Sequence, residues 1–113
     1  MKSPKFYLEH IVEAADRINE YTEEISFEDF VKDDMRYYAT IHLIEQIGEA
    51  SGKLEEEFKT THNSIPWQQI KAMRNRLTHE YWMTDLEQVW KTATEEVPEL
   101  KSKIEVIWNK VNG

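Results

Sequence analysis

Apolar residues recur along this chain at helical spacing, three or four positions apart, rather than at every second position. In the first segment they are Leu8, Ile11, Ala15 and Ile18, which would form one stripe along an α-helix. The same period returns in later segments, and the 113 residues include only three Gly and three Pro that could interrupt helices. The pattern therefore predicts an all-α fold, a single domain over residues 1–113 built as a bundle of about five helices.

Capping residues place the expected helix boundaries. Ser3 and Pro4 match an N-cap followed by a proline in the first turn. Ser26 with Asp29 resembles a capping box, and Thr84 with a Glu three positions later forms another. We expect helices over residues 4–24, 34–58, 66–78, 85–95 and 98–110, with a short helical turn over 27–31 and a polar loop over 60–65.

The expected helix over residues 34–58 carries apolar residues on two faces. The first face comprises Ala39, Leu43, Ile47, Ala50, Leu54 and Phe58, and the second comprises Tyr37, Ile41, Ile44 and Gly48. A helix buried on two sides is either the centre of its bundle or part of a subunit interface, and Gly48 would let another helix approach closely. Because a fold of this size has little core with which to cover both faces, we expect a homodimer.

The net charge of -8 disfavours the broad basic surface with which proteins usually bind nucleic acid. Three cations, Lys71, Arg74 and Arg76, nevertheless lie within six residues of one another. If nucleic acid binds, we expect these three side chains to contact it, because they form a local basic patch on an otherwise acidic protein.

The composition argues against disulfide-bonded, membrane-spanning, secreted and metal-binding proteins. With no cysteine, the chain has neither a disulfide framework nor a thiolate site. No apolar run reaches the roughly 18 residues of a membrane span, and residues 1–4 lack the apolar region of a signal peptide. We therefore expect a cytoplasmic protein with no membrane partner. His10, His42 and His62 lie in separate segments without a Glu-x-x-His pair, so we expect no metal site and no cofactor.

The most informative stretch begins at Arg74 and reads Arg-Asn-Arg-Leu-Thr-His-Glu-Tyr. Arginine binds phosphate, histidine transfers protons near neutral pH, and a tyrosine phenol can act as a nucleophile or a switch. His79 is expected at a helix C-terminus, where capping is an alternative role. Tyr81 is expected in the connection that follows, where it could instead plug the end of the bundle.

Arg74 falls between the apolar Trp67 and Ile70 on a helical wheel, so we expect it to point inward. In that position it must extend to solvent, line a solvated cleft, or pair with a carboxylate such as Glu45 or Glu49. Burying an unpaired guanidinium would otherwise cost several kcal/mol.

A longer pattern resembles the signature of the HEPN superfamily, specifically the HepT-like toxin family: Trp67-x-x-Ile70-x-x-Met73-Arg74-Asn75-x-Leu77-x-His79-x-Tyr81. Further similar residues fall at Phe30, Ile47-Gly48-Glu49-Ala50, Ile65-Pro66-Trp67, Val89-Trp90 and Pro98-x-Leu100. The resemblance covers nearly the whole chain. It implies a HEPN-type helical bundle, a homodimer and a metal-independent endoribonuclease.

In such a ribonuclease the 2′-hydroxyl of RNA is the nucleophile, so the enzyme must align it, remove its proton and stabilise charge on the phosphate. The resemblance implies that Arg74 and His79 are catalytic, the arginine binding phosphate through its planar fork and the histidine acting as general base or acid. It also implies that each cleft receives both residues from two subunits. Asn75 is expected to support them by orienting Arg74 or the substrate.

The family resemblance also implies a partner, a nucleotidyltransferase antitoxin similar to MntA, in a type VII HEPN/MNT toxin–antitoxin system. Tyr81 would be the AMP acceptor, and its adenylylation would block RNA by occupancy and charge repulsion. Two alternatives stay open. The chain could be a non-catalytic HEPN subunit that docks a nucleotidyltransferase or binds nucleotide, or it could be a plain structural dimer in which Arg74 and His79 affect only stability.

Overall fold

A computed structural model describes residues 3–79, 83 and 85–112 of the chain. The helical elements are α1 (Pro4–Thr22), α2 (Phe27–Lys32), α3 (Asp34–Gly52), α4 (Glu56–Thr61), α5 (Trp67–Thr78), α6 (Leu86–Lys91), the π-helical turn η2 (Thr92–Glu96) and α7 (Val97–Asn112). The described residues contain no β-strand, which confirms the all-α prediction. Of the helices in these residues, none has the length and apolar character needed to cross a membrane.

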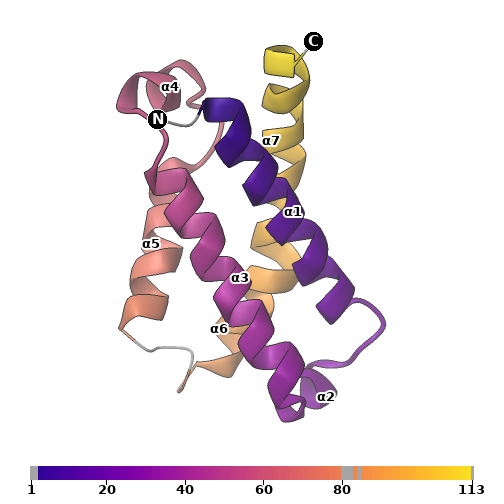
Figure 1. The fold of residues 1–113 in the computed structure, drawn as a ribbon. Helices are drawn as coiled ribbons and strands as arrows, with labels where there is room; N and C mark the ends of the chain where they lie inside the picture. Colours follow the sequence, from indigo (N-terminus) through magenta and orange to yellow (C-terminus); the bar gives the residue numbers. More distant parts are fainter. Residues whose placement is uncertain (1–2, 80–82, 84, 113) are drawn as a thin grey trace.

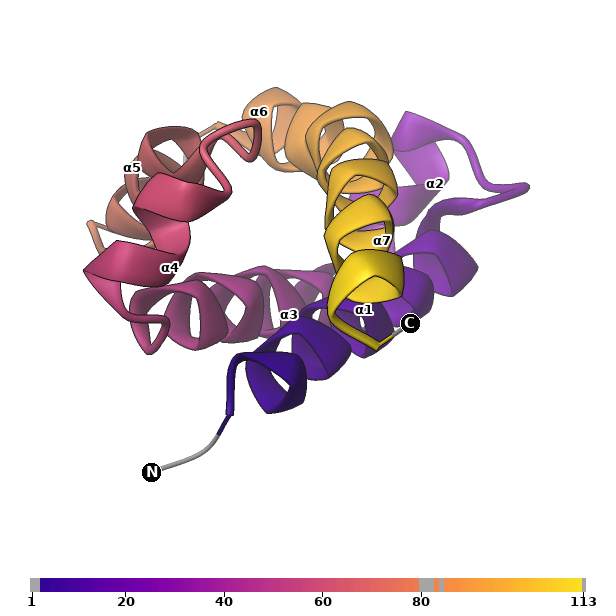
Figure 2. The same ribbon diagram turned by 90° about the horizontal axis from the view of Figure 1, so that it is seen from above.

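The helix α3 is the central element of the bundle. It packs against α1 on one side and α5 on another, while α7 packs against α1 (Figure 1). Seen from above, α5 and α7 lie on opposite sides of the molecule, and α6 lies between them (Figure 2). This arrangement presents α5, which carries the arginine and histidine of interest, at one side of the bundle.

Both apolar faces of α3 are buried inside this single chain. Ile47 of the first face and Ile44 of the second are fully buried, and Tyr37 and Gly48 of the second face are buried. The premise that a fold of this size has too little core to cover both faces is therefore wrong, because α1 and α5 cover α3 from two sides. Of the two alternatives, α3 is therefore the centre of its bundle, with Ile44 and Gly48 buried within the chain, whereas the homodimer itself stays a prediction.

The helix expected over residues 34–58 ends early. α3 stops at Gly52, and after a short turn a separate helix, α4, begins. Glycine is among the poorest helix formers, and Leu54, in the turn, is buried in the core. The Trp67 indole N–H donates to the carbonyls of Lys59 and His62 at 3.2 and 3.0 Å, which holds the end of α4 against the start of α5. Because α4 extends to Thr61, the polar loop expected over 60–65 is partly helical.

The helices α6 and α7 form one continuous helical path through η2, although the sequence predicts two separate helices. Pro98 lies in the first turn of α7 and has no N–H for the usual bond to the carbonyl four residues earlier. The wider π-helical turn immediately before it accommodates this break without ending the helix. The Val97 N–H accordingly donates to the carbonyl of Thr92, five residues earlier.

The predicted caps hold for the first two helices. The hydroxyls of Ser3 and Ser26 each accept a hydrogen bond from the backbone N–H three residues later, at 3.4 and 3.1 Å. The N-cap of α6 is Asp85, whose carboxylate accepts from the Gln88 N–H at 3.1 Å. The prediction of Thr84 as this cap is therefore wrong, and Thr84 itself lies outside the described residues.

Candidate functional site

The helix α5 carries most of the residues that the sequence singles out. Its last turn leads into His79, the C-cap residue, whose backbone N–H donates to the Asn75 carbonyl at 3.2 Å. The buried face of the helix consists of Ile70, Met73 and Leu77. Since this face anchors α5 in the core, the polar residues between these positions project from the other sides of the helix.

The side chain of Arg74 packs on α3 at Gly48. A Cβ atom added to Gly48 would lie 2.7 Å from Arg74 Cβ and 2.9 Å from its Cγ and Cδ, so only glycine leaves room for the arginine stem. Arg74 is nevertheless exposed to solvent, so an arginine whose stem lies against α3 extends outward, which is one of the outcomes expected from the sequence. Its methylene groups pack on the helix while the residue remains accessible, as long cationic side chains commonly do.

Arg74 also lines an open cleft of about 680 Å³ formed by α3, α4, α5 and the connection between α4 and α5, which we call the α3–α5 cleft. The charged residues of its lining are Lys59, Lys71, Arg74 and a single carboxylate, Glu56. The amide side chains of the lining are Asn63, Gln68 and Gln69. The cleft is thus locally cationic, although the chain as a whole carries a net charge of -8.

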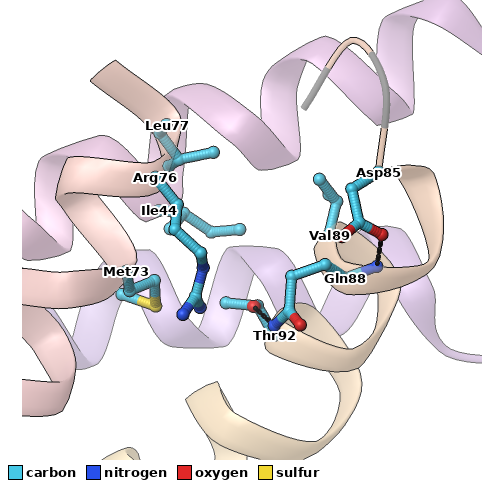
Figure 3. Close-up of a pocket in the computed structure, with 8 residues that line it drawn as sticks. All are labelled: Ile44, Met73, Arg76, Leu77, Asp85, Gln88, Val89 and Thr92. Carbon is cyan, nitrogen blue, oxygen red and sulfur yellow. Dashed lines mark hydrogen bonds between the residues drawn. The ribbon is translucent and has the colours of Figure 1, made fainter. Parts of the chain in front are cut away.

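Arg76 lies in a different, smaller pocket, between α5 and the α6–η2 segment (Figure 3). Its Nη2 is 3.6 Å from Glu96 Oε1, and the same oxygen accepts a hydrogen bond from the Thr92 hydroxyl at 2.7 Å. Arg76 is partly buried in this pocket. The structure brings Lys71 and Arg74 together and separates Arg76 from both.

His79 is exposed at the C-terminal end of α5 and does not belong to the lining of the α3–α5 cleft. Along α5, the other residues that line the cleft come before Arg74, and His79 comes after it. Five residues of helix rise about 7.5 Å and turn by about 140°, so one chain presents Arg74 and His79 in different directions around α5. Asn75 is exposed beside Arg74, and Tyr81, the predicted AMP acceptor, lies outside the described residues.

Tyr37 does not compete for the role assigned to Tyr81. It is buried on α3, and its burial, together with the neighbouring Tyr38 and Asp85, raises the pKa of the Tyr37 phenol to about 12. A phenol in this environment stays neutral and cannot be reached by a modifying enzyme. Among the described residues, no group of three or more His, Asp or Glu side chains could hold a metal ion.

The sequence patterns do not single out Lys59 or the three cleft amides. A signal was available for Gln68, because Gln68, Lys71 and Arg74 follow one another at three-residue spacing and therefore lie in one row on a helix. No such signal existed for Lys59, since its approach to α5 depends on the break after Gly52.

The model of a family described as ribonuclease HepT-like matches residues 11–107 of the chain. A protein named probable ribonuclease HepT from Thermococcus cleftensis is 45% identical over 104 residues, which cover 92% of this chain and 94% of that protein. A candidate RNase from Caldanaerobacter subterraneus subsp. tengcongensis is 41% identical over 110 residues, covering 97% and 98%. One from Methanocaldococcus jannaschii is 34% identical over 103 residues, covering 91% and 94%. No solved structure matches the chain significantly.

Proposed function

The chain belongs to the HepT-like ribonuclease family, and we propose that it is an endoribonuclease that cleaves RNA without a metal ion, using Arg74 and His79. One observation supports this above the others. Arg74 is exposed at a cationic cleft, and His79 is exposed at the end of the same helix, so both are accessible to a polyanion. The local cations offset the repulsion expected from the acidic remainder of the chain.

The proposed reaction uses the RNA 2′-hydroxyl as nucleophile. An imidazole accepts the 2′ proton while the O2′–P bond forms, and the P–O5′ bond breaks as its oxygen takes up a proton. The products are a 2′,3′-cyclic phosphate and a 5′-hydroxyl end. The guanidinium of Arg74 binds the non-bridging oxygens, where negative charge accumulates in the transition state.

We propose that the active site forms between two copies of the chain. Within one copy, Arg74 and His79 diverge around α5, so a second copy that brings its own His79 toward the first copy's Arg74 would complete the site. Two histidines would also supply separate groups for removing and delivering a proton. The exposed α3 residues Met35 and Tyr38 offer apolar surface for such contact outside the buried Ile44 and Gly48.

We further propose that the protein is the toxin of a type VII HEPN/MNT system, held inactive by an MntA-like nucleotidyltransferase. The Tyr81 hydroxyl would attack the α-phosphorus of ATP, displacing pyrophosphate and losing its proton to a base of the transferase. The resulting AMP would place a negative charge two residues from His79. That charge would repel an incoming phosphate and the nucleotide would occupy its space.

Purified protein whose intact mass shows no AMP should cleave RNA in the presence of EDTA. The new 5′ ends should accept phosphate from polynucleotide kinase without prior phosphatase treatment, because they carry hydroxyl groups. His79→Ala should abolish cleavage while the helical circular dichroism is retained. His10→Ala, which alters an exposed residue of α1, should leave cleavage unchanged. An unmodified wild-type protein that cleaves no RNA would instead support the non-catalytic HEPN subunit.

A further inference from the structure

We propose that the α3–α5 cleft binds a segment of single-stranded RNA next to the scissile phosphate, with Lys71 and Lys59 contacting phosphates and the cleft amides contacting bases. The proposal rests on the proposed function, because Arg74 marks the position of the reacting phosphate. It adds residues from α4 and from the N-terminal half of α5 that lie outside the Arg74–His79 motif.

The first support is a polar row along α5. Gln68 and Lys71 are three residues apart, and so are Lys71 and Arg74. The members of each pair are therefore neighbours on the helix surface, separated by about 5–6 Å at their Cβ atoms. All three line the cleft. A strand whose phosphate is bound by Arg74 can therefore continue along α5 toward its N-terminus and meet a second cation, Lys71, and then an amide.

The second support is the opposite wall of the cleft. Lys59 of α4 lines the cleft, and only 19% of its side chain is exposed, so it is held in place better than a free surface lysine. Its ion pair with Glu56, at 3.8 Å, involves a carboxylate side chain that is 92% exposed. Such an exposed pair is weak. The ammonium of Lys59 can therefore exchange this partner for a phosphate.

Trp67 makes this wall rigid. Its indole N–H is engaged by the carbonyls of Lys59 and His62, which fixes the ring between α4 and α5 where the residue lines the cleft. Aromatic residues held in this way are common stacking partners of unpaired bases. The amides of Gln68 and Gln69 add both hydrogen-bond donors and acceptors, which is what base edges require.

The dimensions favour a single strand over a duplex. A volume of about 680 Å³ lies within the range of pockets that enclose small ligands, which suits one or two unstacked nucleotides. Duplex RNA is bound instead by extended surfaces that follow its shape across successive grooves. The size of the cleft, together with the cations and amides that line it, therefore points to unpaired nucleotides as the occupant.

Gly52 provides a direct test, because it lines the cleft and an added Cβ would meet no atom within 4 Å. Gly52→Phe should fill the cleft from the end of α3 without disturbing the core, and Gly52→Ala is its matched control. The probe is a fluorescein-labelled 2′-O-methyl RNA oligonucleotide of unstructured sequence, which the enzyme cannot cleave. Fluorescence anisotropy should show binding weakened by about tenfold or more in the phenylalanine variant and unchanged in the alanine variant.

Lys71→Ala tests the phosphate contact separately and does not depend on how Gly52→Phe folds. The slope of log K against log salt should fall by about 0.7, the value for one phosphate of a single strand. Lys110→Ala, which removes an exposed lysine of α7, should leave the slope unchanged. The cleft assignment would be overturned if folded Gly52→Phe bound the RNA oligonucleotide as tightly as the wild type. It would also be overturned if Lys71→Ala kept the wild-type slope of log K against log salt. Failure of the wild-type protein to cleave RNA, with these binding effects intact, would count against the catalytic proposal alone.

Discussion

Gly48 of α3 lies directly against the side chain of Arg74 of α5. The arginine stem occupies the space that any other residue at position 48 would fill, starting with its Cβ atom. The contact that packs α3 closely on α5 therefore also positions Arg74, the proposed phosphate-binding residue. A glycine that the sequence suggests for a subunit interface instead positions a residue of the candidate active site.

Gly48→Ala should destabilise the protein and slow RNA cleavage. The added methyl would lie 2.7 Å from Arg74 Cβ, so α5 must shift, and overpacking of this kind costs about 1–3 kcal/mol. Most of this range exceeds the roughly 1 kcal/mol that alanine gains over glycine in a helix. Gly52→Ala is the matched control on the same helix and should be neutral or stabilising. Chemical denaturation and cleavage rates distinguish the two, and equal effects at both positions would contradict the packing argument.

Arg76→Met should lower stability slightly and leave RNA cleavage per folded molecule unchanged. The ion pair with Glu96 joins α5 to η2, but its side chains are 37% and 29% exposed, so solvent screening limits its contribution to less than about 1 kcal/mol. Arg74→Met provides the contrast, with reduced cleavage per folded molecule. If Arg76→Met instead loses cleavage while it remains folded, Arg76 contacts the substrate, as the sequence predicts.

Tyr37→Phe should make the protein more resistant to alkaline unfolding. The folded-state pKa of Tyr37, about 12, exceeds the ordinary value of 10.0, so the unfolded chain releases this proton first. The stability that the buried neutral phenol contributes is present below pH 10 and is lost as the pH rises from about 10 to 12. The decline of the free energy of unfolding over this range should be shallower in Tyr37→Phe than in the wild type. Identical slopes would show that the phenol ionises without penalty.

Tyr81→Phe should prevent adenylylation without preventing cleavage. Incubation of the wild-type protein with its cognate nucleotidyltransferase and ATP should raise its intact mass by AMP units and stop RNA cleavage. The Tyr81→Phe protein should keep its mass and its activity under the same conditions, and Tyr21→Phe, which alters a partly exposed tyrosine of α1, should behave as wild type. A mass increase that persists in Tyr81→Phe would move the acceptor to another residue.

Much of the fold can be predicted from the sequence because local chemistry determines it. Ser3 and Ser26 cap their helices as expected, and the apolar stripe of α1 is buried in the core. The errors occur where tertiary context decides. The helix over residues 34–58 breaks after Gly52, and Pro98 does not interrupt its helix because a π-helical turn absorbs the missing hydrogen bond.

The candidate site was harder to predict than the fold. The motif correctly marks the helix that carries Arg74 and His79, and both prove to be exposed. A helical wheel cannot show that an arginine placed toward the core would pass over a glycine and reach solvent, since that depends on the α3–α5 distance. The sequence also cannot show that Lys71 and Arg74 line one cleft while Arg76 lies in another pocket. That separation depends on where α6 and η2 pack against α5.

The central claim, that Arg74 and His79 act together on one phosphodiester, is tested most directly by a double-mutant cycle in the RNA cleavage assay. The account predicts that Arg74→Ala and His79→Ala each reduce the cleavage rate at least about a hundredfold. It also predicts that the double variant is little slower than either single variant, because residues that act as a unit are not additive. Cleavage that survives both substitutions in folded protein would contradict the account.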